Sequence, residues 1–462
     1  MKILMLAPYI YDAAMPEFTV NKTGFGMMVN DIAKSVACLD DVLLLTRVIT
    51  SGTENHMGSY MLQSHTWKQI LLSASFADWC CALKSFICSK GTIKNRLRIA
   101  FYAFDNGAVR KTIKTSKSDI VHIHGIGNIT KGYIKVCEEL RIPYVVTLHG
   151  LNGLNDSIAV SSEERNLERD FLIFAERSNV PVSVISSGIK KRIEDNYIHK
   201  SSNNIVVITN GVNASGESDF IEEANNKSNV YQNSFSNLNE DSITQDSLKE
   251  IVKSCKNNGK QIIFVVGNIT DNKNQKQIVD IAGELNNAVV FLFGNECDNG
   301  VVRTGIAENQ LQDKVILAGF CSTLDSLWEY ADLNVVLSIS EGFGMSIVEG
   351  YIHGIPTVTF NDLDAVPDLY DSSSMLLCDS RSNGELADTI NRALAMNWDK
   401  AAIRKHGNKY SMERIAKEYW EFFDRIIAKN NERRNDNECA VYGGRKKTQS
   451  HNGNISSVFR CF

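Results

Sequence analysis

Residues 335–350 read VVLSISEGFGMSIVEG, and this stretch decides the fold that the sequence predicts. A short β-branched and apolar run ends in serine, a loop with glycines at 342 and 344 follows, and an apolar stretch of helical character comes next. The first N–H groups of a helix have no partner inside the helix, and the helix dipole adds to their attraction for an anion. The stretch therefore predicts a strand, a glycine loop and a helix N-terminus that together bind a phosphate.

Two glutamates, Glu341 and Glu349, stand on either side of this junction. Ionised carboxylates accept hydrogen bonds from hydroxyl groups. A phosphate with hydroxyl groups on both sides describes a nucleotide sugar, and the pattern favours that ligand class. The spacing of the glutamates alone would equally suit a favourable charge near a helix start and an ordinary exposed side chain.

Length and composition describe a globular protein of two domains. The chain has 462 residues, of which 43% are hydrophobic and 22% charged, and this length exceeds one ordinary core. A net charge of −5 argues against a general nucleic-acid binder. The eleven cysteines are scattered without a Cys-x-x-Cys pair, which indicates reduced thiols and argues against a disulfide framework or a zinc site.

Short apolar strands alternate with amphipathic helical stretches through most of the chain. Strands buried on both faces, as in parallel sheets, have this near-continuous Val/Ile/Leu content. We predict twelve strands: 2–7, 42–46, 119–123, 143–148, 182–185 and 204–208, then 261–266, 288–293, 314–317, 333–338, 356–360 and 374–378. Two such series predict an α/β fold of two doubly wound, Rossmann-like domains that face a central cleft, where ligands bind beyond the strands' carboxyl ends.

The remaining segments divide the chain further. We predict an N-terminal domain at 1–205, a linker with a polar insertion at 206–250 and a C-terminal domain at 251–408. A capped amphipathic helix is expected at 409–429, and a polar, disordered tail at 430–462.

The stretch around Glu341 and its continuation, Glu349-Gly350-Tyr351-Ile352-His353-Gly354, resemble the signature of the family 4 retaining glycosyltransferases. The resemblance extends over most of residues 1–428 and implies the GT-B fold, with the acceptor on the N-terminal domain and the nucleotide sugar on the C-terminal domain. It implies that Glu341 and the loop amides hold the donor sugar and phosphates, and that Glu349 binds the ribose. The loop residues are Gly342, Phe343, Gly344, Met345 and Ser346.

Two further segments match the family at other places, and a further histidine is a candidate by its position alone. Gly24 and Gly26 follow the first strand, where the family has a glycine-rich loop that reaches the donor diphosphate. His149 ends the strand segment Pro143–Gly150 and resembles the family's histidine beside the transferred sugar. His124 ends the preceding strand and is a candidate for the acceptor side. A turn or a structural histidine is the simpler explanation of each of these when taken alone.

The segment from Gly267 to Asn274 departs from the family. The family commonly has Gly-Arg-x-x-x-x-Lys-Gly, whose arginine and lysine hold the diphosphate. Lys273 matches the lysine, but Asn268 replaces the arginine, so one positive charge is gone although asparagine can still donate a hydrogen bond. Either another basic residue compensates, or stabilisation of the leaving group is weaker.

Residues 67–117 combine aromatic side chains with basic ones. Nine Lys and Arg residues lie between 84 and 117 against Asp105 alone, and Trp67, Phe76 and Trp79 lie upstream. Such a surface can contact an anionic membrane peripherally, or can be a solvated basic face over packed helices. No uninterrupted apolar run reaches the roughly 20 residues of a membrane span, and we expect a cytoplasmic protein that can lie at the inner face of the membrane.

We predict a retaining transferase that moves a hexose-type sugar from a nucleotide diphosphate sugar to a saccharide or lipid-linked acceptor, in cell-surface polysaccharide or glycolipid synthesis. Glu341, His149 and Lys273 would serve catalysis, with no metal or other cofactor. The alternative is a scaffold subunit of the same fold that binds nucleotide sugar without turnover. An epimerase on this fold is a further rival, and a nicotinamide oxidoreductase is disfavoured because no Gly-x-Gly-x-x-Gly follows the first strand.

Overall fold

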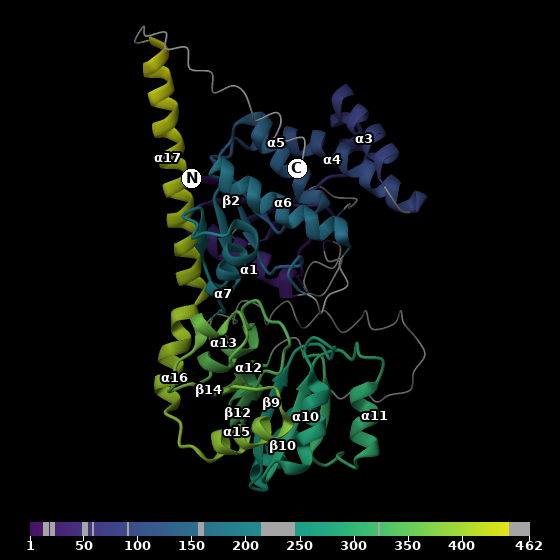
Figure 1. Ribbon diagram of the computed structural model, residues 1–462, viewed down its shortest axis with the longest axis vertical. Helices are drawn as coiled ribbons and strands as arrows, with labels where there is room; N and C mark the ends of the chain where they lie inside the picture. Colours follow the sequence, from purple (N-terminus) through teal and green to yellow (C-terminus); the bar gives the residue numbers. More distant parts are fainter. Residues whose placement is uncertain are drawn as a thin grey trace.

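The computed structural model describes residues 1–12, 18, 24–48, 54–57, 60–89, 92–155, 161–213, 245–321 and 324–442. Most of the predicted polar insertion and the end of the predicted tail, 443–462, lie outside the described residues. The chain forms two α/β domains stacked end to end, with a long helix running beside both of them (Figure 1).

The N-terminal domain is built on a sheet whose described strands follow the order β3-β4-β2-β1-β5-β6-β7-β8. All neighbours are parallel except β3, which pairs antiparallel with β4. The central strands are buried on both faces, as their apolar sequences predict. The strands are β1 Lys2–Ala7, β2 Asp41–Thr46, β3 Glu54–Met57, β4 Tyr60–Ser64, β5 Ile120–His124, β6 Tyr144–Leu148, β7 Val182–Val184 and β8 Ile205–Val207.

The C-terminal domain has a parallel sheet in the order β11-β10-β9-β12-β13-β14. Strand β10 is apolar and buried along its whole length, whereas β9 and β12 each include one polar residue, Gln261 and Asn334. The strands are β9 Gln261–Val266, β10 Ala288–Phe293, β11 Val315–Gly319, β12 Leu333–Val335, β13 Thr357–Phe360 and β14 Met375–Cys378. The two doubly wound domains of the predicted fold are thus present.

Helices cover both sheets. In the N-terminal domain they are α1 Gly24–Ala37, α2 Trp67–Ser73, α3 Phe76–Cys88, α4 Ile93–Ser116, α5 Asn128–Leu140, α6 Ser162–Ser178 and α7 Ser187–Ile193, followed by the π-turn η2 Glu194–Ile198. In the C-terminal part they are α9 Gln245–Asn257, α10 Gln275–Ile281, α11 Val301–Glu308, α12 Asp325–Trp328, α13 Met345–Ile352, α14 Val366–Leu369, α15 Asn383–Ala395, α16 Lys400–Gly407 and α17 Met412–Tyr442, with short 3₁₀ turns η4 Ala282–Glu284 and η5 Asn408–Tyr410.

Each of the twelve predicted strands corresponds to an observed one, but β3 and β4 were not predicted. The sequence of β4, YMLQS, mixes apolar and polar residues because its side chains alternate between buried and partly exposed positions. It lies near the edge of the sheet and lacks the continuous apolar run of the central strands.

The chain crosses twice between the domains, and the two crossings touch. Val212 N–H donates to the Tyr410 carbonyl at 2.9 Å, and Met412 N–H donates to the Val212 carbonyl at 2.9 Å. A Cβ on Gly211 would lie 2.8 Å from Ile415 Cγ1, so only glycine fits here. The Asn210-Gly211 pair therefore permits close approach of the two crossings.

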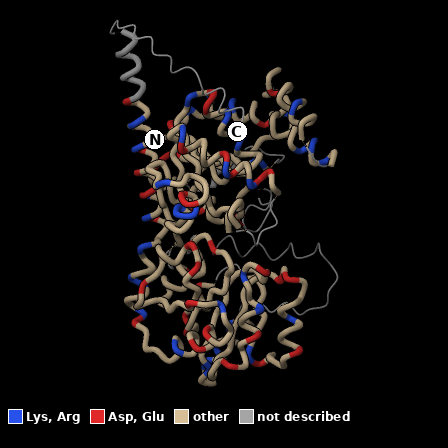
Figure 2. Tube along the Cα trace, in the orientation of Figure 1, with Lys and Arg blue, Asp and Glu red and all other residues tan. Residues whose placement is uncertain are grey.

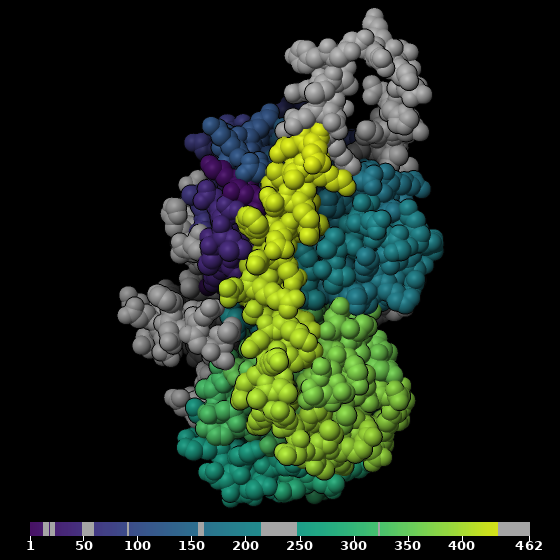
Figure 3. Space-filling model, turned by 90° about the vertical axis from the view of Figure 1, so that its left-hand side faces the viewer, coloured from purple at the N-terminus to yellow at the C-terminus, as the bar shows by residue number. Residues whose placement is uncertain are grey.

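Helix α17 returns along the N-terminal domain, where Tyr419 and Phe423 are buried with residues of β1 and α1 (Figure 3). The helix continues to Tyr442, beyond the predicted boundary at 429, and the prediction of a disordered tail is wrong for residues 430–442. No glycine or proline interrupts residues 412–442, and the first glycine after them is Gly443.

None of the helices within the described ranges is by itself long and apolar enough to cross a membrane. Helices α2 and α3 pass that test only as a pair, with a bend of 109° between them.

Candidate functional site

The loop between β12 and α13 forms the floor of the site. It ends at Gly344, which has a φ of 80° and permits the abrupt entry into α13 at Met345. Phe343 is buried and contacts Tyr410 edge-on at 5.8 Å between ring centroids, so it can contribute only its backbone to a ligand. The first turn of α13 carries the N–H groups of Met345 and Ser346, which the helix itself cannot pair. The predicted strand, glycine loop and helix N-terminus are therefore present, and the helix begins at Met345.

Glu341 and Lys273 form an ion pair at the edge of this loop. The Glu341 side chain is 17% exposed, and Ser338 Oγ donates to its Oε2 at 3.0 Å. Burial raises the pKa of Glu341, but the charge of Lys273 and hydrogen bonds from Lys273, Ser338 and the Gly344 backbone together hold its pKa below the ordinary value. The carboxylate is thus ionised at neutral pH, with Lys273 held against it.

Two loops hold Lys273 in place. Asn272 accepts from the Ser340 N–H at 3.2 Å and donates to the Ser340 carbonyl at 3.0 Å, and its own carbonyl accepts from the Ile339 N–H at 2.7 Å. The Lys273 stem passes over Gly267, whose φ of 143° suits glycine and where a Cβ would lie 3.4 Å from Lys273 Cε. The loop after β9 and the loop after β12 therefore position the Lys273–Glu341 pair together.

Asn268, at the position where the family commonly has arginine, contacts a neighbouring loop. Its side chain is exposed, and its Oδ1 accepts from the backbone N–H of Asn295 at 3.1 Å and from the Asn295 amide at 3.3 Å. The residue thus ties the loop after β9 to the loop after β10. Its predicted role in donor binding is not visible in this arrangement.

His149 follows β6 and lies at the cleft, half-buried. Its Nε2 is 3.0 Å from His124 Nδ1, the two rings stack at 5.3 Å, and Phe25 contacts His149 edge-on at 5.0 Å. Burial lowers the pKa of His149 to about 4, so the imidazole is neutral at physiological pH. His149 Nδ1 is buried and makes no hydrogen bond to the described part of the chain.

His124 is fully buried, and burial lowers its pKa well below the ordinary value. From its position at the end of β5 we predicted that His124 lies on the acceptor side. Because it is fully buried, it cannot line an open acceptor surface. It supports His149 from behind, while His122 lies behind it in turn with its Nε2 2.6 Å from Thr147 Oγ1. The histidines form a buried row that leads to the cleft.

Glu349 lies one turn into α13 and is partly buried. The pKa of Glu349 is raised to about 7, mainly by burial and also by the nearby Asp325 and Asp31 carboxylates, while the positive charges of His353 and Lys273 oppose the rise. Asp31 belongs to α1 of the N-terminal domain, so Glu349 faces the opposing domain. Its protonation changes in the physiological range.

Gly24 and Gly26 form the first turn of α1, where we had predicted a loop. Gly26 is buried, and a Cβ there would lie 2.7 Å from the Tyr11 backbone nitrogen, so close packing against residues 10–11 accounts for this glycine. Gly24 has open space where its Cβ would be and stands at the start of the helix. Phe25 between them packs near His149 and thereby joins α1 to the row of histidines.

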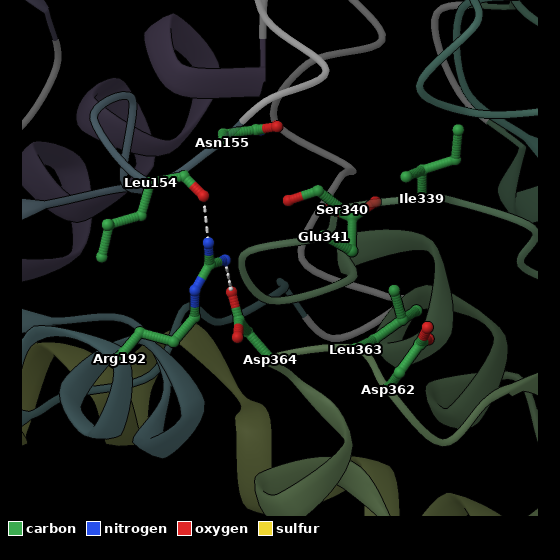
Figure 4. A pocket seen from close by; sticks show the side chains of 9 residues that line it. All are labelled: Leu154, Asn155, Arg192, Ile339, Ser340, Glu341, Asp362, Leu363 and Asp364. Atoms are coloured by element: carbon green, nitrogen blue, oxygen red, sulfur yellow. Dashed lines mark hydrogen bonds and ion pairs between the residues drawn. The ribbon is translucent and has the colours of Figure 1, made fainter. Parts of the chain in front are cut away.

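The structure also places Arg192 of α7 in the site, a residue that the sequence analysis missed. Arg192 Nη1 donates to Asp364 Oδ2 at 2.8 Å, and its Nη2 donates to the Leu154 carbonyl (Figure 4). A cavity of about 190 Å³ is lined by these residues together with Ser340 and Glu341. Arg192 thus brings a guanidinium from the N-terminal domain into the cavity that also contains Glu341.

The domains meet beside this cavity. Asp368 at α14 accepts from the Ser187 backbone N–H at 2.7 Å and from Ser187 Oγ at 2.9 Å. A Cβ on Gly188 would lie only 2.2 Å from the Asp364 carbonyl oxygen, so the start of α7 rests directly on the backbone of the other domain. Likewise, a Cβ on Gly342 would lie 3.3 Å from the His149 carbonyl oxygen. The cleft is closed in this conformation.

Over the residues whose placement is described, no group of three or more His, Cys, Asp or Glu side chains could hold a metal ion. The arrangement offers two cations, a helix N-terminus, two carboxylates of different pKa and a neutral imidazole. Such a set can bind an anionic diphosphate and position the hydroxyl groups of a sugar.

The chain was compared with families of known proteins. Residues 246–410 match the family described as "Glycosyl transferases group 1", and residues 87–215 match "Glycosyltransferase Family 4". A poly(glycerol-phosphate) alpha-glucosyltransferase of Bacillus subtilis (strain 168) is 29% identical over 111 residues, which make up 24% of this chain and 15% of that protein. The chain thus matches only a small part of this relative's length.

Solved structures share the whole architecture. A sucrose-phosphate synthase from Thermosynechococcus elongatus has a TM-score of 0.63 at 16% identity, covering 93% of this chain and 100% of that one. Anabaena HepE in complex with UDP has a TM-score of 0.59 at 15% identity, covering 92% and 100%. At such identities the likeness shows the two-domain fold.

Proposed function

Because the chain belongs to the family 4 glycosyltransferases and has the GT-B fold, we propose that it transfers a hexose from a nucleotide diphosphate sugar, with retention of the anomeric configuration. The acceptor is a saccharide or a lipid-linked acceptor, in the synthesis of a cell-surface polysaccharide or glycolipid. The reaction uses no metal. The observation that carries the proposal is the ion pair of Lys273 with Glu341 beside the start of α13.

Each of these groups binds a different part of the donor. Lys273 and the N–H groups of Met345 and Ser346 face the diphosphate, and Glu341 faces a sugar hydroxyl. Glu349, further along α13, accepts from the ribose hydroxyls. His149, whose imidazole is neutral, lies beside the hexose near the reacting carbon. The chain thus supplies orientation and charge stabilisation.

Retention follows if the acceptor attacks the face from which the diphosphate departs. The bond between the anomeric carbon and the diphosphate oxygen breaks, the acceptor hydroxyl forms the new bond, and a departing diphosphate oxygen takes the hydroxyl proton. No protein side chain needs to become the nucleophile. Lys273 stabilises the negative charge that develops on the leaving oxygen in the transition state, and this stabilisation lowers the activation barrier.

The nature of the donor is supported by the structures of similar fold. Anabaena HepE was solved with UDP and with UDP and glucose, and the Bacillus relative is named a glucosyltransferase. We therefore propose UDP-glucose as the first donor to test and polyglycerol phosphate as the first acceptor.

A catalytically degenerate, nucleotide-sugar-binding subunit is the second candidate, and the observation that favours it is the exposed Asn268 in place of arginine. Arg192 argues against a degenerate subunit, because it places a guanidinium in the cavity beside Glu341, where the arginine absent at position 268 is not available. The two candidates differ in turnover and share donor binding.

Nucleotide binding should identify the donor class and depend on Glu349. A thermal-shift panel of UDP, GDP, dTDP and ADP is expected to show stabilisation by one nucleotide, by ~2.7 kcal/mol at 100 times its Kd. Binding of that nucleotide should weaken about tenfold between pH 8 and pH 6, because Glu349 has a pKa of about 7 and only its ionised form accepts two ribose hydrogen bonds.

The variant Glu349→Gln should bind more weakly at pH 8 and lose most of this pH dependence, whereas Glu329→Gln, an exposed glutamate of the same domain, should leave both unchanged. If nucleotide binding by Glu349→Gln kept the wild-type pH dependence, Glu349 would not be the group that binds the ribose. Failure of all four nucleotides to stabilise the wild type would contradict the proposed donor class.

A further inference from the structure

The α3–α4 hairpin carries an apolar surface that no described part of the chain covers. Six of the seventeen large hydrophobic side chains that are exposed in the described structure lie on α3 and the start of α4, and three more lie on the preceding α2. Isolated exposed hydrophobic residues are normal, but a contiguous group of them marks an interaction surface. The proposed sugar transfer makes no use of this group.

The exposed residues form a continuous stripe on α3. Phe76, Trp79, Leu83 and Ile87 are 85%, 52%, 62% and 63% exposed, and their spacing of three and four residues puts them on one face of the helix. Ile93 and Leu97, at the start of α4, are 68% and 56% exposed.

The opposite face of α3 is packed, so the stripe is not a loosely held helix. Ala82 lies against Ala100 and Ala103 of α4. Arg96 Nε donates to the Phe86 carbonyl at 2.7 Å, and its guanidinium stacks over the Phe86 ring at 4.7 Å. Asp78 is buried and bound to Arg110 at 3.1 Å. The hairpin is therefore a rigid element that presents one apolar face outward.

Positive charge surrounds this face. Residues 66–104 contain six Lys and Arg residues, and their single acidic residue is the buried Asp78. Lys84 follows Leu83 on α3, and Lys94 and Arg98 alternate with the exposed apolar residues of α4; all three are exposed. Figure 2 shows Lys and Arg positions along the hairpin, which projects from the N-terminal domain away from the C-terminal domain (Figure 1).

We propose that the α3–α4 hairpin docks the protein on a membrane surface that contains anionic phospholipid. The apolar stripe enters the boundary between headgroups and acyl chains, and the Lys and Arg side chains meet the lipid phosphates. A face for a second copy of this chain would gain nothing from six positive charges and one neutralised acid, since like charges would oppose each other. The charge therefore favours a lipid surface over self-association.

Flotation of the full chain with vesicles tests the proposal. Wild type should bind phosphatidylcholine vesicles that contain one quarter phosphatidylglycerol much more tightly than pure phosphatidylcholine vesicles. The triple variant Phe76→Ser/Leu83→Ser/Ile87→Ser should lose roughly tenfold in partitioning. The matched control Val301→Ser/Phe320→Ser/Met396→Ser, which alters exposed apolar side chains of the C-terminal domain, should bind like wild type.

The charge contribution is tested separately. In the variant Lys84→Gln/Lys94→Gln/Arg98→Gln, binding to the anionic vesicles should weaken roughly fivefold per charge removed. Added salt should weaken wild-type binding to a similar extent. Lys253→Gln/Lys260→Gln/Lys405→Gln, on exposed lysines of the C-terminal domain, is the matched control. An unchanged thermal midpoint and nucleotide binding show that each variant is folded.

Equal binding of the hairpin and control variants to anionic vesicles would overturn the proposal. So would a wild-type dimer in light scattering that the triple serine variant abolishes while vesicle binding is absent. Neither result would bear on sugar transfer, because no residue of the hairpin belongs to the proposed donor site.

Discussion

Replacing Lys273 by alanine is expected to lower kcat for sugar transfer ~10³-fold, because it removes the side-chain charge closest to the leaving diphosphate in the proposed site. Lys273 is held against Glu341 and over Gly267 by the loops after β9 and β12, so it is oriented before the donor binds. The loss should fall on kcat more than on donor KM, since charge on the leaving oxygen develops in the transition state. Release of nucleotide diphosphate from the donor measures it.

The matched control is Lys276→Ala, three residues along the chain. Lys276 is exposed on α10 and pairs with Asp280 at 2.7 Å, so its loss should leave kcat unchanged. Glu341→Gln removes the partner charge, keeps the side-chain shape and should also depress kcat strongly. Wild-type turnover in Lys273→Ala would contradict the assignment of this pair, provided that thermal unfolding shows the variant to be folded.

Gly188→Ala is expected to lower kcat/KM about a hundredfold, because displacement of catalytic groups by an ångström can cost that much. A Cβ at this position would lie 2.2 Å from the Asp364 carbonyl oxygen, and backbone cannot give way as a flexible side chain would. The start of α7 must move off the C-terminal domain, which separates Arg192 from Asp364 and opens the cavity beside Glu341. Steady-state kinetics and small-angle scattering, which should show a larger radius of gyration, check this expectation.

Gly384→Ala is the control for the same change in the same local setting. Gly384 and Gly188 are each the second residue of their helices, but nothing lies within 4 Å of a Cβ at Gly384. The control should therefore keep wild-type kinetics and gain slightly in stability, as alanine favours a helix over glycine by up to ~1 kcal/mol. Equal kinetics for the two variants would show that the closed cleft is not needed for transfer.

The parts of the structure that were predictable from sequence are those encoded by short segments. Central strands such as β1 and β10 are buried on both faces, so continuous apolar runs identify them. The strand, loop and helix around Glu341 lie within one short stretch, and the chemistry of that stretch could be inferred before its shape was known.

The parts that were missed depend on residues far apart in the chain. Arg192 and Asp364 are separated by 172 positions, and neither lies in a motif, so only the packing of α7 on α14 brings them together. Gly26 matched a phosphate-loop pattern, yet the close Tyr11 backbone explains it. His124 matched a cleft residue, yet the sheet buries it. A glycine or histidine has several structural uses, and only the fold distinguishes them.

The most direct test of the account is turnover of the nucleotide sugar whose nucleotide the binding panel identifies, followed by NMR of the transferred sugar. The account predicts release of nucleotide diphosphate and a product with the same anomeric configuration as the donor, lost in Lys273→Ala and kept in Lys276→Ala. Tight donor binding without release, across saccharide and polyglycerol phosphate acceptors, would instead identify a nucleotide-sugar-binding subunit. A product of inverted configuration would contradict the proposed same-face reaction.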